Sequence, residues 1–67
     1  MTPSEKTFLQ SLDGVDFVGD TIEVLVSIVG GKIPRSEEHL RAREILDKSC
    51  NEIKRIHSGM YVVYKLK

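Results

Sequence analysis

The stretch SEEHLRAREILDKSCNEIKRIH, residues 36–57, decides the predicted fold because its apolar residues recur with a helical period. At 100° per residue, one narrow stripe holds Ala42, Leu46, Ser49, Ile53 and Ile56. The opposite side of the same helix is charged or polar and holds Arg41, Glu44, Asp47, Lys48, Asn51, Glu52 and Arg55. This pattern predicts one long amphipathic helix with a single buried face.

The two ends of this stretch carry typical helix boundaries. Ser36 can cap the first turn, and Glu37 and Glu38 place negative charge at the positive end of the helix dipole. Ser58-Gly59 predicts the stop, because glycine readily takes the left-handed conformation that ends many helices. We therefore expect a helix from Ser36 to His57.

Segments on both sides of this helix have the character of strands. Thr21 to Val29 is nearly all apolar or β-branched, and Met60 to Leu66 alternates in a way that predicts a second strand. Val15 to Val18 predicts a short third strand, joined to the first by Gly19-Asp20, a pair compatible with a two-residue hairpin turn. The sequence therefore predicts three strands.

The first residues predict a short helix. Thr2 can cap it, Pro3 suits the first helical position, and Glu5 stands three residues after the cap as in a capping box. Asp13-Gly14 ends the element. Over residues 1–67 we thus expect a single small α+β domain of order α-β-β-α-β, with a three-stranded sheet packed against one long amphipathic helix.

The size of the chain favours self-association. A chain of 67 residues buries only about 60% of its unfolded surface, so domains of this size usually add a disulfide, a metal or a partner subunit. One cysteine excludes an internal disulfide, and two histidines with that cysteine are too few and too scattered for a structural zinc site. We expect neither a metal nor a cofactor, and we expect a homodimer or larger ring.

The predicted sheet indicates where such an interface lies. One long helix can cover only one face of the sheet, so the apolar residues of the other face need another partner. These predicted interface residues are Leu25, Val29, Tyr61 and Val63. Either the N-terminal helix or a second copy of the chain could cover them.

The charge distribution suggests a second kind of site. Residues 1–31 hold one lysine and five acidic residues, whereas residues 32–67 hold nine basic and five acidic residues, giving net charges of −4 and +4. The candidate anion-binding residues are Lys32, Arg35, Arg41, Lys48 and Arg55. The last three recur every seven residues on the predicted helix and could follow the phosphates of a nucleic acid or hold a nucleotide. The competing interpretation is a solvated helix face with pairs such as Glu44–Lys48.

The chain lacks the common catalytic patterns. It has no Ser-His-Asp order, HExxH or CxxC, so we expect no enzyme activity within one subunit. No signal peptide and no segment long enough to span a bilayer is visible, and a lone cysteine fits the reducing cytoplasm. We therefore expect a cytoplasmic, non-enzymatic protein-interaction module, a regulator, adaptor or inhibitor, that binds itself and another protein. The alternative function is binding of an anionic ligand.

Overall fold

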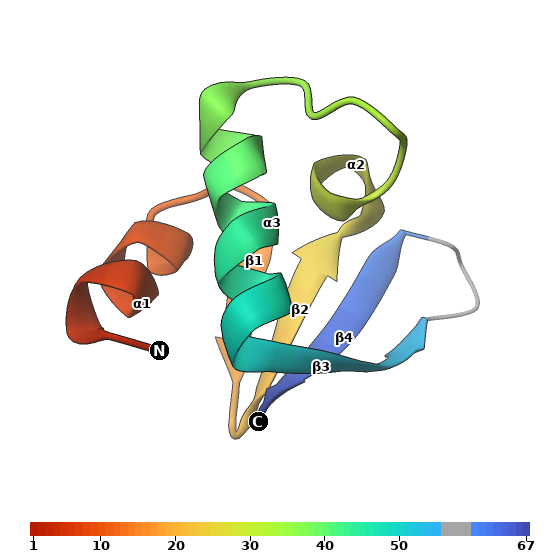
Figure 1. Cartoon of the computed structure of the whole chain (residues 1–67). Helices are drawn as coiled ribbons and strands as arrows, with labels where there is room; N and C mark the ends of the chain where they lie inside the picture. Colours follow the sequence, from red (N-terminus) through yellow and green to blue (C-terminus); the bar gives the residue numbers. More distant parts are fainter. Residues whose placement is uncertain (56–59) are drawn as a thin grey trace.

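The computed structural model describes residues 1–55 and 60–67, which form three helices and four strands (Figure 1). The elements in chain order are α1 (Pro3–Gln10), β1 (Val15–Val18), β2 (Thr21–Leu25), α2 (Val26–Val29), α3 (Glu37–Ser49), β3 (Cys50–Arg55) and β4 (Tyr61–Leu66). The predicted α+β class is confirmed, but the sheet has four strands where the sequence predicted three.

The sheet is antiparallel throughout, with the strand order β1-β2-β4-β3. Val18 pairs with Thr21 across the Gly19-Asp20 turn, so the predicted hairpin is confirmed. Gly19 has a φ of +60°, a conformation that glycine takes without steric cost. The segment from β2 through α3 returns to the sheet as the edge strand β3, and β4 then lies between β2 and β3.

The long helix begins where the sequence predicted and ends earlier. The Ser36 side chain accepts a hydrogen bond from the backbone N–H of His39 at 3.2 Å, which confirms the predicted cap. The prediction of helix as far as His57 is wrong, because α3 ends at Ser49 and Cys50 is already extended, with φ −134° and ψ 160°. The predicted stop at Ser58-Gly59 lies outside the described residues.

Pairing with β4 explains why the helical pattern is not followed after Ser49. Cys50 lies opposite Leu66, and the backbone N–H of Lys67 donates to the Ser49 carbonyl at 3.0 Å. Ile53, which a continued helix would bury, sits at a shift in the strand register and is 50% exposed. Helical periodicity is a local signal, and here the hydrogen bonds to a distant strand prevail over it.

The predicted strand from Thr21 to Val29 is also shorter than expected. It ends at Leu25 and continues as the single turn α2, which is closed by the Gly30 N–H donating to the Val26 carbonyl. This turn carries Ile28 into the core, where it is buried. Burial of Ile28 favours the helical turn over a longer strand.

The N-terminal helix has the predicted capping box. The Thr2 hydroxyl accepts from the Glu5 N–H at 3.2 Å, and the Glu5 carboxylate accepts from the Thr2 N–H at 2.9 Å. These reciprocal bonds satisfy backbone donors that the first turn leaves free. The helix ends at Gln10, before the predicted stop at Asp13-Gly14.

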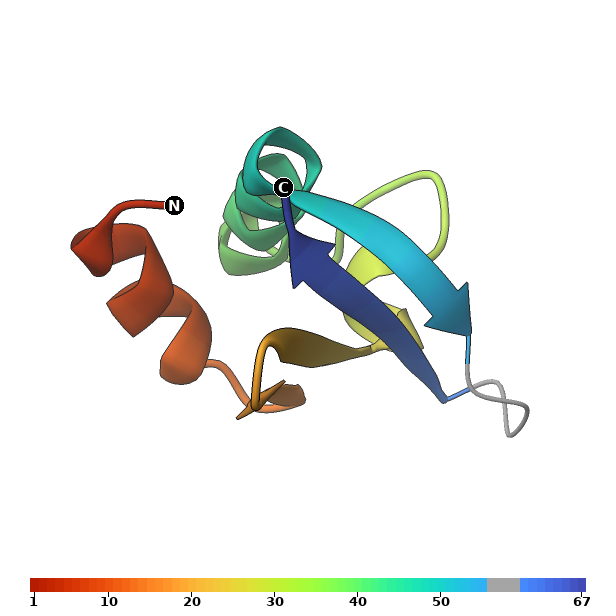
Figure 2. The ribbon, with the colours of Figure 1, turned by 90° about the horizontal axis from the view of Figure 1, so that it is seen from below.

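The helices α1 and α3 lie on one side of the sheet (Figure 2). The short helix α2 follows the end of β2, contacts α3 and contributes Ile28 to the core. The core fills the space between the helices and the inner face of the sheet. Its buried members are Leu9, Val15, Ile22, Val24, Ile28, Ala42, Ile45, Leu46, Cys50, Val62 and Tyr64. Among the described residues, no helix has the length and apolar character needed to cross a membrane.

Candidate functional site

The face of the sheet turned away from the helices, called the outer face below, is free of helices in the described part of the chain (Figure 2). Successive side chains of a strand point to opposite faces, so the residues that alternate with the buried core residues along each strand define this face. Strand pairing arranges its residues in three rows across the sheet. These rows are Leu25 and Tyr61; Asp16, Glu23, Val63 and Lys54; and Val18, Thr21, Lys65 and Asn51.

One end of the outer face is apolar. Leu25 pairs with Tyr61, and both side chains are half-buried; Leu25 also packs against the core. The side chain of Leu25 lies over Gly14, where an added Cβ would stand 2.5 Å from a Leu25 methyl carbon. Val63 is only 4% exposed, so it supports this face but offers little contact area to a partner.

Three of the four predicted interface residues thus share the outer face, and the fourth does not. Val29 belongs to α2 and packs against the core. Its predicted place on the sheet depends on a strand that reaches Val29, whereas β2 ends at Leu25. The outer face therefore has a smaller apolar area than the sequence predicted.

Charges divide the outer face into two halves. Asp16 and Glu23 lie directly opposite each other on β1 and β2, an arrangement of like charges that weakens an antiparallel pair. Lys54 and Lys65 lie on β3 and β4. Lys65 forms an exposed ion pair with Asp20 at 3.4 Å, whereas the ion pairs found among the described residues leave Asp16, Glu23 and Lys54 unpaired.

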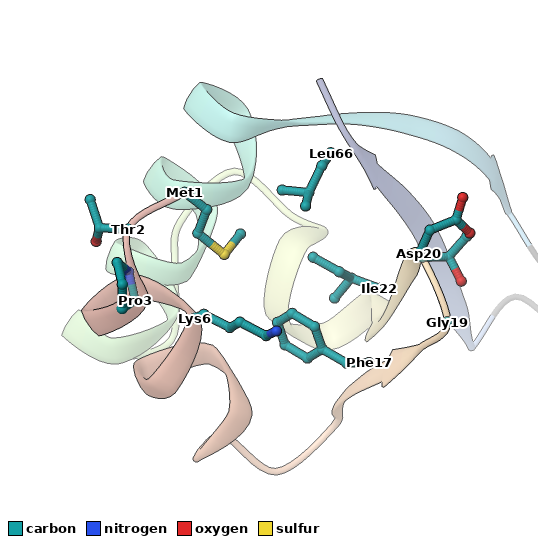
Figure 3. Close-up of a pocket in the computed structure, with 10 residues that line it drawn as sticks. Met1, Thr2, Pro3, Lys6, Phe17, Gly19, Asp20, Ile22 and Leu66 are labelled. Atoms are coloured by element: carbon teal, nitrogen blue, oxygen red, sulfur yellow. The ribbon is translucent and has the colours of Figure 1, made fainter.

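A cavity of about 420 Å³ opens on the helix side of the sheet, between the start of α1 and the β1–β2 turn. Figure 3 shows Ile22, Phe17 and Leu66 around it, with Lys6 reaching across. The Lys6 ammonium stands 5.7 Å from the centre of the Phe17 ring, within cation–π range. The cavity is large enough for an apolar side chain. No buried, unpartnered polar group among its described lining residues specifies a ligand.

The basic residues predicted to bind an anion are placed separately. The Lys48 ammonium pairs with the Glu5 carboxylate at 2.9 Å, so this lysine joins α3 to α1. The Arg41 guanidinium lies 4.5 Å from the centre of the Phe8 ring, and Arg55 belongs to β3. These three residues therefore do not form a row on one helix. Lys32 and Arg35 are exposed in the loop before α3.

Arg43 has a structural role that the sequence pattern does not indicate. Its guanidinium donates to the carbonyls of Ile28 at 2.8 Å, of Gly31 at 3.2 Å and of Gly30. It thereby satisfies carbonyls at the end of α2 and just after it, where no further helical turn donates N–H groups to them. No sequence signal marks this role, because the acceptors are main-chain groups 12 to 15 residues earlier.

The lone thiol belongs to the core. Cys50 is buried, and burial raises the pKa of its thiol. A thiol held protonated in this way is a poor nucleophile and a poor metal ligand. Within the described residues, no three His, Cys, Asp or Glu side chains are placed to hold a metal ion together.

Comparisons with protein-family models, curated proteins and solved structures find no match. The function is therefore inferred from the geometry of this chain.

Proposed function

We propose that the chain is a small, non-enzymatic protein-interaction module that self-associates through the outer face of its sheet. One observation carries the proposal: Leu25 and Tyr61 lie side by side at one end of the two central strands, on the face of the sheet opposite to the core residues of those strands. The occupant of this face is a second copy of the chain. As a homo-oligomer, the module would act as a regulator, adaptor or inhibitor of another protein.

The composition of the outer face supports contact with protein over exposure to water. Antiparallel sheets can leave one face in water, and that face is then usually polar. Here Leu25 and Tyr61 make one end of the two central strands apolar, and the charged residues Asp16 and Lys54 lie on the two edge strands. Apolar residues flanked by charged ones are common in protein interfaces.

The proposal is tested by the mass of the protein in solution. For the wild-type chain, sedimentation equilibrium should give a weight-average mass that rises with concentration. Tyr61→Asp places a charge in the apolar pair of the outer face and should keep the chain monomeric over the same range. Leu40→Asp is the control, because Leu40 is an apolar surface residue that lies on α3, in the helix layer.

Far-UV circular dichroism of each variant establishes that it is folded. A wild-type chain that stays monomeric up to millimolar concentration would refute the proposal. So would self-association that Tyr61→Asp leaves unchanged.

A further inference from the structure

Resting on the proposed self-association, we infer the arrangement of the two copies. Their outer faces pack about a two-fold axis that runs parallel to the strands, between β2 and β4. In this arrangement Lys54 of each copy lies against Asp16 and Glu23 of the other.

The strand order limits the possible arrangements. When two copies pack through the same face, the two-fold axis lies in the plane between the sheets. An axis parallel to the strands places β1 of one copy over β3 of the other, and β2 over β4, because the strand order is β1-β2-β4-β3. An axis perpendicular to the strands instead places every strand over its own counterpart.

The charges distinguish these two arrangements. Asp16, Glu23, Val63 and Lys54 form one row across the sheet. With the perpendicular axis, acidic residues of β1 and β2 face the same acidic residues of the second copy, and Lys54 faces Lys54. With the parallel axis, Asp16 faces Lys54 of the second copy. Like charges across an interface are costly, so the charges favour the parallel axis.

The parallel axis also accounts for two local features of the outer face. Leu25 lies over Tyr61 of the second copy, which brings the apolar ends of the two outer faces together. The like-charged pair of Asp16 and Glu23 gains a cation that the single chain does not provide among its described ion pairs. In the dimer, Lys54 of each copy would lie between the Asp16 and Glu23 carboxylates of the other copy.

The expected dimer is weak. Four strands about 4.8 Å apart, with five residues of about 3.4 Å each, cover roughly 300 Å² in projection. A standard interface buries about 800 Å² on each partner. We therefore expect a dissociation constant on the order of 10 µM or weaker, rising with salt as the rim charges are screened.

A charge exchange tests this arrangement. Asp16→Lys places lysines opposite lysines in the dimer, and Lys54→Asp places aspartates opposite aspartates, so each variant should dimerise at least about 10-fold more weakly than wild type. An equimolar mixture of the two variants restores both opposite-charge contacts. The mixture should form a heterodimer with about wild-type affinity.

The controls carry the same charge changes outside the outer face. Asp47→Lys lies on α3 and Lys32→Asp lies in the loop before it, and both residues are exposed. Each control should dimerise as wild type does. Native mass spectrometry at low ionic strength, with one variant isotope-labelled, identifies homodimers and heterodimers by mass.

The outcomes separate this inference from the proposed function. A wild-type chain that never dimerises refutes the proposed function and the arrangement together. A wild-type dimer whose single charge variants dimerise normally refutes the arrangement and leaves self-association standing. The same charge contacts could also form if β1 of one copy paired edge to edge with β3 of the next. Such pairing continues from copy to copy beyond a dimer, so a mixture that assembles into species larger than two chains also refutes the arrangement.

Discussion

Among single residues, Glu5 connects two elements through one carboxylate. That carboxylate accepts a hydrogen bond from the backbone N–H of Thr2 at 2.9 Å and pairs with Lys48 at 2.9 Å. The backbone hydrogen bond is the larger cause and the lysine the second, and together they lower the pKa of Glu5 from 4.5 to about 2. Glu5 therefore caps α1 and ties it to α3 at the same time.

This pKa predicts how stability depends on pH. A carboxyl whose pKa is lower in the folded state stabilises the fold above its unfolded pKa, and the effect is lost as the pH falls through the folded pKa. The contribution of Glu5 is therefore complete above about pH 4.5 and disappears as the pH falls to about 2. Titration of the Glu5 carboxyl carbon by NMR measures the folded pKa directly.

Substitution of the lysine separates the two causes. Lys48→Met should raise the pKa of Glu5 only part of the way towards 4.5, because the Thr2 N–H still donates to the carboxylate. Lys6→Met is the matched control, since Lys6 lies over Phe17 and should leave the Glu5 titration unchanged. A Glu5 pKa near 4.5 in the wild-type chain would contradict the capping geometry.

Residue patterns predict some features of this chain correctly because their causes are local. The caps at Thr2 and Ser36 are of this kind, since a cap involves residues only three apart. The end of α3 at Ser49 does not have a local cause, because it depends on the pairing of Cys50 with Leu66, sixteen residues later in the chain. Only the folded sheet brings those residues together.

At the scale of elements, α2 and α3 are joined by Arg43. Three donors of its guanidinium reach carbonyls of Ile28, Gly30 and Gly31. A lysine has a single ammonium group and cannot match this fork. Arg43→Lys should therefore lower the free energy of unfolding by about 1–3 kcal/mol, which urea denaturation can measure.

Arg41→Lys provides the comparison for this prediction. Arg41 lies two residues earlier on the same helix and contacts the Phe8 ring from an exposed position. A lysine retains a cation near that ring, so the loss should be below about 1 kcal/mol. Equal losses for the two substitutions would show that the bonds of Arg43 add no stability of their own.

The candidate site is predictable from the sequence only where the elements are predicted correctly. Alternation within β2 and β4 is enough to place Leu25, Tyr61 and Val63 on one face of the sheet. The same reasoning cannot place Lys54 beside them, because the periodicity of its segment predicts a helix. The charged halves of the outer face exist only because β3 forms the sheet edge.

At the scale of the whole molecule, self-association should be coupled to stability. A dimer that binds only folded chains stabilises them by mass action, so the melting temperature Tm must depend on protein concentration. In the proposed dimer, burial of the outer face would add to the small core that 67 residues can form. Association and folding of the wild-type protein should therefore be measurable in one experiment.

Above the dissociation constant, a tenfold increase in concentration should raise the Tm of the wild-type chain by a few degrees, since about 1 kcal/mol shifts Tm by roughly 4–8 °C in a domain of this size. Asp16→Lys should show almost no such rise, because its dimer is weakened. Salt at about 1 M should reduce the wild-type rise by screening the rim charges. Calorimetry at two concentrations and two salt levels measures all three effects.

A concentration-independent Tm, for a protein that sediments as a dimer, would mean that association does not distinguish folded from unfolded chains. The outer face of the folded sheet could then not be the surface through which the copies meet.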